Sequence, residues 1–122
     1  MVTQRKVVAL VEDDPSVLTG LQRLLSARGF EAEPFASAEA FLDGASASKA
    51  GCLVLDIHLG GMSGIELRRR LAVSGSAIPV IFMTAFDDEL TQREAVEAGC
   101  IAYLHKPFSA HSLIAALEMA AS

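Results

Sequence analysis

Residues 52–57 read CLVLDI, and this stretch decides the fold class. The run is apolar at odd and even positions alike up to Asp56, so a strand here would be buried on both faces. Val7 to Val11 and Pro79 to Thr84 have the same short, apolar character and contain several β-branched residues. Strands of this kind are typical of a parallel sheet that is covered by helices on both sides.

Between these strands, apolar residues recur at helical spacing, as at Val17, Leu21 and Leu25 in a helix that should end near Gly29. The remaining helical stripes are near Ala38 to Leu42, Ile65 to Leu71, Asp88 to Ala98 and Leu113 to Met119. Two weaker strand candidates are Phe30 to Phe35 and Cys100 to Leu104. Five strand-and-helix units, with no repeat and no linker, predict a single doubly wound α/β domain over residues 1–122.

Pro34 indicates the order of the strands. Proline has no backbone N–H to donate, so the second strand should lie at an edge of the sheet, as in the flavodoxin-like order 2-1-3-4-5. In that order the strands that begin at Cys52 and Cys100 are separated by the fourth strand, about 10 Å apart and beyond disulfide reach. We therefore expect buried thiols and a reducing compartment, the cytoplasm.

Polar residues follow the apolar run at four strand ends. They are Glu12-Asp13-Asp14 after the first strand, Asp56 in the third, Thr84 in the fourth and Lys106 after the fifth. The carboxyl ends of parallel strands meet at one edge, and ligands bind there near the switch point between strands one and three. The sequence therefore predicts a functional site at this edge.

Each of these residues also has an ordinary structural interpretation. Asp14 before Pro15 is typical of a helix N-cap followed by proline, and we favour that role for Asp14. Alone, Asp56 would be a turn residue, Thr84 a β-forming residue and Lys106 a solvated lysine. Their occurrence together favours chemistry: repelling carboxylates need a cation such as Mg²⁺, and a carboxylate nucleophile, an ammonium and a hydroxyl suit phosphoryl transfer.

Four motifs in this order resemble the receiver domain of bacterial two-component response regulators, from about Lys6 to about Ala121. They are Val11-Glu12-Asp13-Asp14, Leu55-Asp56-Ile57 with Gly64 beyond it, Met83-Thr84-Ala85, and Gly99 through Tyr103-Leu104-His105-Lys106-Pro107-Phe108. The spacing from Asp13 to Asp56, Thr84 and Lys106 is similar to that of nitrogen-fixation-regulator receivers. The resemblance implies a CheY-like fold and a phosphoacceptor signalling domain rather than an enzyme with turnover.

The resemblance also implies the roles of individual residues. Asp56 would accept a phosphoryl group from a phosphohistidine of a sensor histidine kinase or phosphotransfer protein. Asp13, Asp56 and the main-chain carbonyl of His58 would bind Mg²⁺, with Glu12 acting mainly through metal-bound water. Lys106 and Thr84 would each contact a phosphoryl oxygen.

The implied switch follows from these contacts. Tyr103 would change rotamer when Thr84 moves, and the Lys106–Pro107 peptide bond would be cis. A protein-interaction surface formed by the fourth helix, fifth strand and fifth helix would then respond to phosphorylation. The fourth helix has few large apolar residues, Leu90 and Val96, so it is a reasonable moving part, although an ordinary short surface helix has the same composition.

Two positions, Gly60 and His58, differ from the residue that is common in the family or lie where the family varies. Gly60 stands where a proline is common, which predicts a more flexible loop from His58 to Gly64. His58, two residues after Asp56, stands where the family varies, and the resemblance implies that side chains at this position affect access of water to the acyl phosphate; Phe86 lies two residues after Thr84. We hypothesise that His58 or Phe86 tunes dephosphorylation.

Composition excludes other classes. Lys and Arg total 10 against 15 Asp and Glu, and the net charge of -5 disfavours binding to nucleic acid or anionic membranes. No apolar run is long enough to span a bilayer, and the polar segment Met1 to Lys6 does not support a signal peptide. We expect Arg68-Arg69-Arg70 to form a solvated helix face, with Glu66 and Arg70 paired at i,i+4.

Three rival functions fit less well. A haloacid-dehalogenase-type phosphatase needs a second aspartate where His58 stands, and an FMN binder needs a phosphate cradle that the acidic loop after the first strand lacks. An interaction module that is never phosphorylated is disfavoured by the intact acidic residues, threonine and lysine. The kinase, the downstream protein target and dimerisation on phosphorylation stay open, as does the choice between a stand-alone regulator and the receiver of a longer transcription regulator.

Overall fold

A computed structural model describes residues 6–86 and 88–120; residues 1–5 of the polar N-terminal segment and the end of the family resemblance at Ala121 lie outside them. The sheet has five parallel strands in the order β2-β1-β3-β4-β5. Their bounds are β1 Lys6–Val11, β2 Phe30–Phe35, β3 Cys52–Asp56, β4 Val80–Thr84 and β5 Ala102–His105. The predicted doubly wound fold and strand order are confirmed, with Pro34 on an edge strand.

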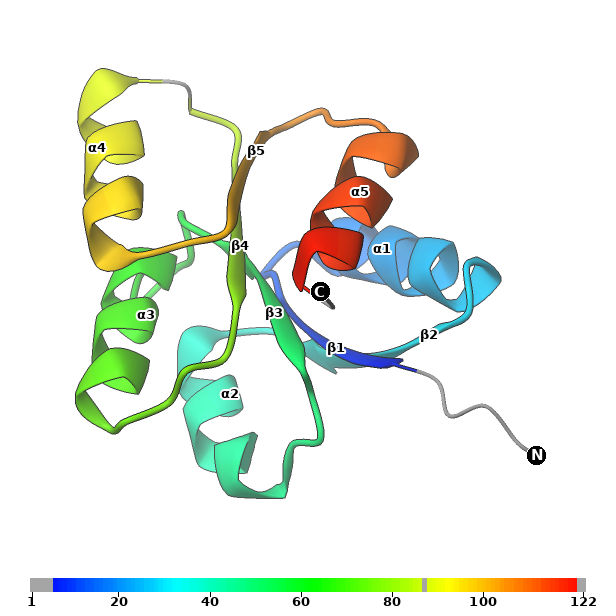
Figure 1. The fold of residues 1–122 in the computed structure, drawn as a ribbon, viewed down its shortest axis with the longest axis horizontal. Coiled ribbons are helices and arrows are strands. Elements are labelled where there is room, and N and C mark those ends of the chain that lie inside the picture. The colour runs from blue at the N-terminus through cyan, green and yellow to red at the C-terminus, as the bar shows by residue number, and fades with distance from the viewer. Residues whose placement is uncertain (1–5, 87, 121–122) are drawn as a thin grey trace.

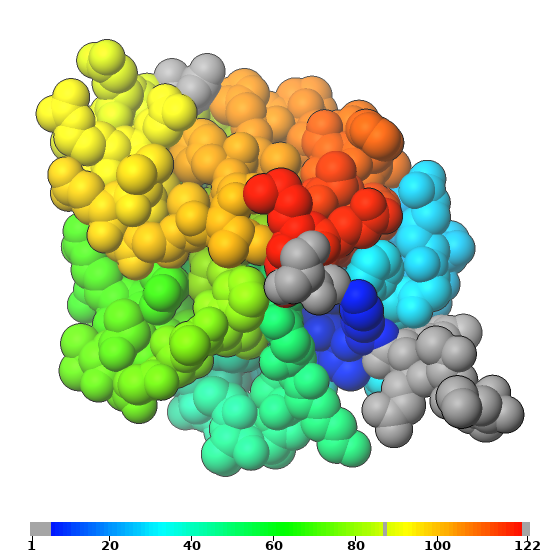
Figure 2. Space-filling view, viewed as in Figure 1, coloured from blue at the N-terminus to red at the C-terminus, as the bar shows by residue number. Residues whose placement is uncertain are grey.

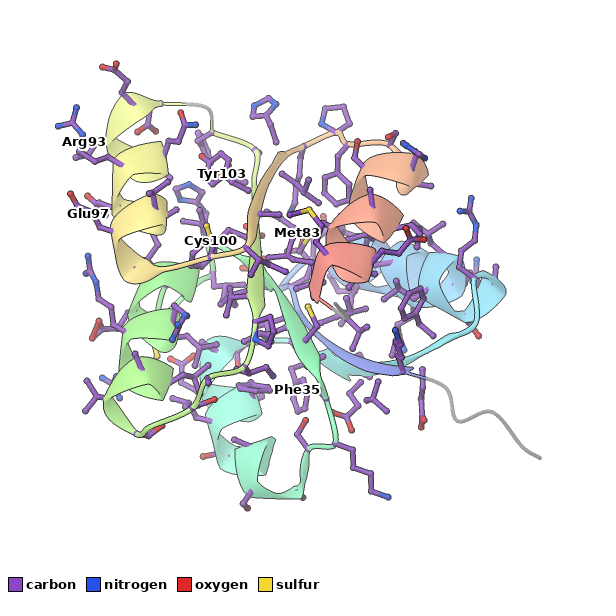
Figure 3. All side chains as sticks on the ribbon, in the orientation of Figure 1. Phe35, Met83, Arg93, Glu97, Cys100 and Tyr103 are labelled. Atoms are coloured by element: carbon purple, nitrogen blue, oxygen red, sulfur yellow. The ribbon has the colours of Figure 1, made fainter. Side chains whose placement is uncertain are left out.

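Helices cover both faces of the sheet (Figure 1). Their bounds are α1 Pro15–Ala27, α2 Ala38–Gly44, α3 Gly64–Val73, α4 Glu89–Ala98 and α5 Ala110–Ala120, with a 3₁₀ turn at Ala45–Ala47. One apolar cluster joins α1 and α5 to the sheet, and a second joins α2, α3 and α4 to the opposite face. In Figure 3, Met83 lies on the α5 side of the sheet, whereas Phe35 and Tyr103 lie on the other.

The two central strands carry the core. Every residue of β3 and β4 is buried, including Asp56 and Thr84 at their carboxyl ends. This is the pattern expected from runs that are apolar at both parities. Packing in the core therefore fixes the positions of Asp56 and Thr84, the two strand ends that the sequence predicted to belong to the site.

Helix caps agree with the local sequence. Asp14 caps α1 as predicted: its Oδ1 accepts the backbone N–H of Ser16 at 2.9 Å and that of Val17 at 3.4 Å, and Pro15 follows. The Ser16 hydroxyl also donates to this carboxylate. This hydroxyl bond, and then the two backbone bonds, hold the pKa of Asp14 below its ordinary value. Asp88, taken in the sequence as the first helical residue, is instead the N-cap of α4 and accepts the Thr91 N–H at 2.7 Å.

Helix α4 has little contact with the core. Ala95 is its buried residue, and the large apolar side chains of Leu90 and Val96 are 64% and 63% exposed. Half-buried β5 reaches the surface between α4 and α5, so the three elements form one continuous part of the face in Figure 2. In the part of the chain that the structure describes, no helix has the length and apolar character to cross a membrane.

Three further expectations need correction. The strand predicted from Cys100 begins at Ala102, because Gly99, with a φ of 93°, ends α4 and Cys100 belongs to the connection. Both cysteines are free, as predicted, but only Cys52 is buried; Cys100 is half-buried. Arg68 is not part of a solvated face, because its Nε donates to the Gly99 carbonyl at 3.1 Å.

Candidate functional site

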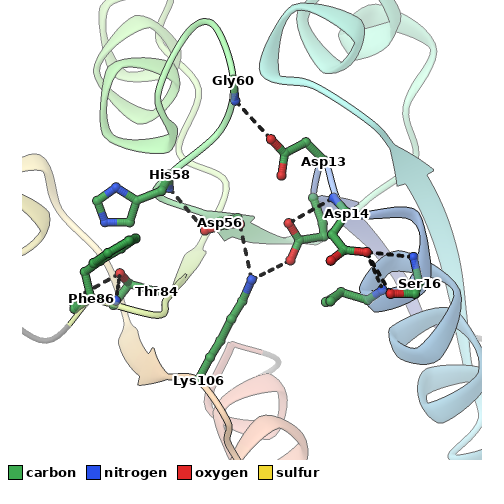
Figure 4. Close-up of polar contacts among 11 residues, drawn as sticks. Asp13, Asp14, Ser16, Asp56, His58, Gly60, Thr84, Phe86 and Lys106 are labelled. Atoms are coloured by element: carbon green, nitrogen blue, oxygen red, sulfur yellow. Dashed lines mark hydrogen bonds and ion pairs between the residues drawn. The ribbon is translucent and has the colours of Figure 1, made fainter.

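The candidate site lies at the carboxyl edge of the sheet, where Lys106 contacts Glu12 and Asp56, and where Thr84 ends the neighbouring strand β4 (Figure 4). The backbone there continues the hydrogen-bond ladder beyond the strand ends. The N–H of Glu12 donates to the carbonyl of Phe35 at 3.1 Å, and that of Lys106 donates to Thr84 at 2.7 Å. These bonds fix the main chain from which the functional side chains project.

The Lys106 ammonium bridges two buried carboxylates. Its Nζ donates to Glu12 Oε1 at 2.5 Å and to Asp56 Oδ2 at 3.2 Å. The side chains of Glu12 and Asp56 are 1% and 7% exposed, and that of Lys106 is 22% exposed. Because water is largely excluded, these charges interact more strongly than an exposed pair would.

The pKa values reflect this arrangement. Burial, helped by the neighbouring Asp56 carboxyl and opposed by Lys106, raises the pKa of Glu12 to about 7. Burial alone would lower the pKa of Lys106, but the Glu12 hydrogen bond and the Asp56 charge outweigh it and raise that pKa. Lys106 is therefore a stable cation in the site.

Three carboxylates could hold a metal ion. One oxygen from each of Glu12, Asp13 and Asp56 lies within 4.8 Å of the others. Asp13 is exposed, and its Oδ2 accepts the Gly60 N–H at 3.0 Å; Asp56 Oδ1 accepts the His58 N–H at 3.1 Å. Hard carboxylate oxygens are the ligands that divalent cations such as Mg²⁺ and Ca²⁺ take in proteins.

Thr84 and Tyr103 occupy defined positions near this cluster. The Thr84 hydroxyl donates to the Phe86 carbonyl at 3.1 Å and accepts the Phe86 N–H at 3.0 Å, so it is turned toward its own loop. Tyr103 is half-buried and packs against the apolar cluster under α2, α3 and α4. The Lys106–Pro107 peptide bond, expected to be cis, is cis.

Several contacts were missed from the sequence. The ring of His58 meets that of Phe86 edge to face, with centroids 4.6 Å apart. Glu39 of α2 accepts the Met62 N–H at 3.1 Å, and Asp13 accepts the Gly60 N–H, so carboxylates from two other segments hold the loop after β3. Backbone donors have no sequence signature, and only the unusual Gly60 could have drawn attention to this loop.

Comparison with known proteins identifies the family. Residues 8–118 match the family described as the response regulator receiver domain. The chain belongs to this family. It is therefore a receiver domain of the kind that two-component signalling systems use.

Its relatives include regulators of the nitrogen-fixation type, as the motif spacing predicted. The chain is 37% identical to the response regulator protein TmoT of Ectopseudomonas mendocina, over 96% of this chain and 53% of that protein. It is 34% identical to the transcriptional regulatory protein FixJ of Bradyrhizobium diazoefficiens, over 97% of this chain and 58% of that protein. The chain thus spans about half the length of these curated relatives.

Solved structures agree with the fold. The crystal structure of FixJ-N superposes with a TM-score of 0.89 at 36% identity, covering 97% of this chain and 94% of that one. The response regulator StyR gives a TM-score of 0.87 at 42% identity, covering 96% of this chain and 59% of that one.

Proposed function

We propose that Asp56 accepts a phosphoryl group from a phosphohistidine of a sensor histidine kinase or a histidine phosphotransfer protein. The observation that carries this proposal is the position of the Asp56 carboxylate, 3.2 Å from the Lys106 ammonium and beside the carboxylates of Glu12 and Asp13. In the transfer, a carboxylate oxygen of Asp56 attacks phosphorus. A P–O bond forms, the P–N bond breaks, and the electron pair leaves with the imidazole nitrogen.

The surrounding residues would contact the phosphoryl group and hold the cation. Lys106 bridges Glu12 and Asp56 and would contact a phosphoryl oxygen attached to Asp56. Glu12, Asp13, Asp56 and the main-chain carbonyl of His58 would hold Mg²⁺, Glu12 mainly through water. The cation would supply charge neutralisation for the phosphoryl oxygens.

Thr84 would couple the chemistry to the surface. Its hydroxyl is engaged with Phe86, at the start of the connection to α4. A phosphoryl group adds about -1.5 to -2 charge and strong acceptor oxygens, toward which Thr84 would turn. Tyr103 would then change rotamer, and the α4, β5 and α5 surface would bind a downstream protein in its altered form.

Helix α4 suits this role because its anchorage is weak. Its exposed Leu90 and Val96 leave few core contacts to break when the helix shifts. The proposal applies equally to a cytoplasmic stand-alone regulator and to the receiver of a longer transcription regulator, including one that forms a homodimer when phosphorylated. In either case the domain is a phosphoacceptor that promotes its own phosphorylation and dephosphorylation and contacts no nucleic acid itself.

Intact-mass measurement after incubation with Mg²⁺ and acetyl phosphate tests the proposal. We expect wild type to gain one phosphoryl group, Asp56→Asn to gain none, and EDTA to prevent the gain. Asp43→Asn, which changes an exposed carboxylate in α2, is the matched control and should behave as wild type. If wild type gains nothing from acetyl phosphate or from a phosphorylated histidine kinase, the phosphoacceptor role is excluded.

A further inference from the structure

A backbone donor in the loop after β3 contacts an acidic side chain in the loop after β1. The Gly60 N–H donates to Asp13 Oδ2 at 3.0 Å (Figure 4). Asp13 is exposed, and within the described residues this is the hydrogen bond that its carboxylate makes. An exposed aspartate samples several rotamers, so a single well-formed bond of this kind selects among them.

The selected rotamer points Asp13 at its neighbours. With the Gly60 bond in place, an oxygen of Asp13 lies within 4.8 Å of oxygens of both Glu12 and Asp56. The bond occupies only Oδ2, and a carboxylate has acceptor positions to spare on both oxygens. Carboxylates that bind metals are in turn held by hydrogen bonds from outside the ligand set.

We propose that the Gly60 N–H is a positioning group that orients Asp13 for the divalent cation and stays bonded to it when the cation is bound. The inference rests on the proposed function, because it concerns the metal site of that function. It adds to the site a main-chain donor that acts through Asp13 and does not itself touch the cation. Because proline, which is common at this position in the family, has no N–H, the donor is a feature of this chain and not of the family's metal site in general.

The loop that presents this donor is held from its other side. Glu39 Oε2 accepts the Met62 N–H at 3.1 Å, and the loop passes Gly61 at a φ of 129°. A Cβ built on Gly61 would lie 2.9 Å from Glu39 Oε2, so glycine permits this close approach. The backbone N–H groups of Glu39 itself and of Met62 donate to the Glu39 carboxylate and lower its pKa. Glu39 therefore stays charged at neutral pH.

A substitution at residue 60 can remove the backbone N–H that bonds to Asp13 while leaving every acidic residue of the site unchanged. Proline has no N–H, so Gly60→Pro deletes the bond to Asp13. Gly60→Ala keeps the N–H, and its Cβ would lie 3.6 Å from Asp13 Oδ2, an ordinary contact. The alanine variant therefore controls for loss of glycine flexibility, while the proline variant also loses the donor.

Calorimetric titration of Mg²⁺ into the unphosphorylated protein provides the first test. We expect Gly60→Ala to bind Mg²⁺ as wild type does, and Gly60→Pro to bind it about 10-fold or more weakly. Equal or tighter binding by Gly60→Pro would overturn the inference while leaving the proposed function intact. Failure of wild type to bind Mg²⁺ at all would instead overturn the metal site itself.

Amide hydrogen exchange in the wild-type protein gives a test that needs no variant to fold. If the bond persists with the cation, the Gly60 N–H should exchange no faster after Mg²⁺ addition than before it. Faster exchange at Gly60 on Mg²⁺ binding, with the Met62 N–H unchanged as internal reference, would show that Asp13 leaves Gly60 and would overturn the inference.

Discussion

The imidazole ring of His58 lies edge to face against the phenyl ring of Phe86, with centroids 4.6 Å apart and planes at 71°. His58 lies two residues after the end of β3 and Phe86 two residues after the end of β4. The contact therefore joins the loop that follows Asp56 to the loop that follows Thr84. Phe86 is 59% exposed, and its backbone holds the Thr84 hydroxyl. The pair is therefore placed to influence both the entry of water and the movement of Thr84.

Removing either ring should shorten the lifetime of phosphorylated Asp56. Aromatic pairs contribute about 0.5 to 1.5 kcal/mol, so we expect His58→Ala and Phe86→Ala each to speed dephosphorylation by about two- to tenfold. Because the rings act as one contact, the double variant should decay little faster than the faster single variant. Decay can be followed by intact mass after removal of the phosphodonor. Unchanged decay in both single variants would exclude a role for the pair.

Loss of the Lys106 ammonium should destabilise the metal-free protein. Lys106→Met leaves the buried carboxylates of Glu12 and Asp56 without their cation, and breaking a buried pair in this way costs about 3 kcal/mol. Urea unfolding in EDTA at pH 8 measures the change. The control is Lys49→Met, whose side chain is exposed and whose effect should stay within about 0.5 kcal/mol. Equal effects of the two substitutions would contradict the prediction.

The metal-free protein should lose stability as pH rises through neutrality. The pKa of Glu12 is raised to about 7 in the folded protein, above its ordinary value of 4.5, so the folded state binds the extra proton between these values. The contribution of Glu12 is therefore fully present below about pH 4.5 and lost as pH rises through about 7. Glu12→Gln should remove this part of the pH dependence, which unfolding curves in EDTA from pH 5 to 8 can measure. If the difference in unfolding free energy between wild type and Glu12→Gln does not change from pH 5 to 8, the raised pKa of Glu12 is contradicted.

The sequence predicted the parts of this molecule that depend on the main sheet. The apolar runs at 52–57 and 79–84 indicated buried strands, Pro34 indicated an edge, and parallel topology then brought Asp56, Thr84 and Lys106 to one end. These inferences succeed because burial and backbone hydrogen bonding act on every residue of a strand. A pattern of several residues can therefore report them.

The sequence did not predict contacts that depend on a single backbone group or on how two helices approach. The Gly60 N–H is invisible in the sequence because every residue but proline has one. Arg68 lies in a run of three arginines that indicated a solvated face, but α3 packs beside α4 and brings Arg68 Nε to the Gly99 carbonyl. The roles of Glu12, Asp13, Asp56, Thr84 and Lys106 in phosphoryl transfer stay predictions.

The same substitution, glycine to alanine, should have opposite effects at two places. A Cβ on Gly64 would lie 2.3 Å from the Asp56 carbonyl oxygen and 3.0 Å from its carbonyl carbon, both backbone atoms that cannot move without shifting the end of β3. Gly64→Ala should therefore destabilise the protein by about 3 kcal/mol and slow phosphorylation of Asp56. Gly20 lies within α1 with nothing within 4 Å of its built Cβ, so Gly20→Ala should stabilise by about 0.5 to 1 kcal/mol and leave phosphorylation unchanged. Urea midpoints at constant slope measure both changes. Equal stability of the two variants would show that the close approach of α3 to β3 does not constrain Asp56.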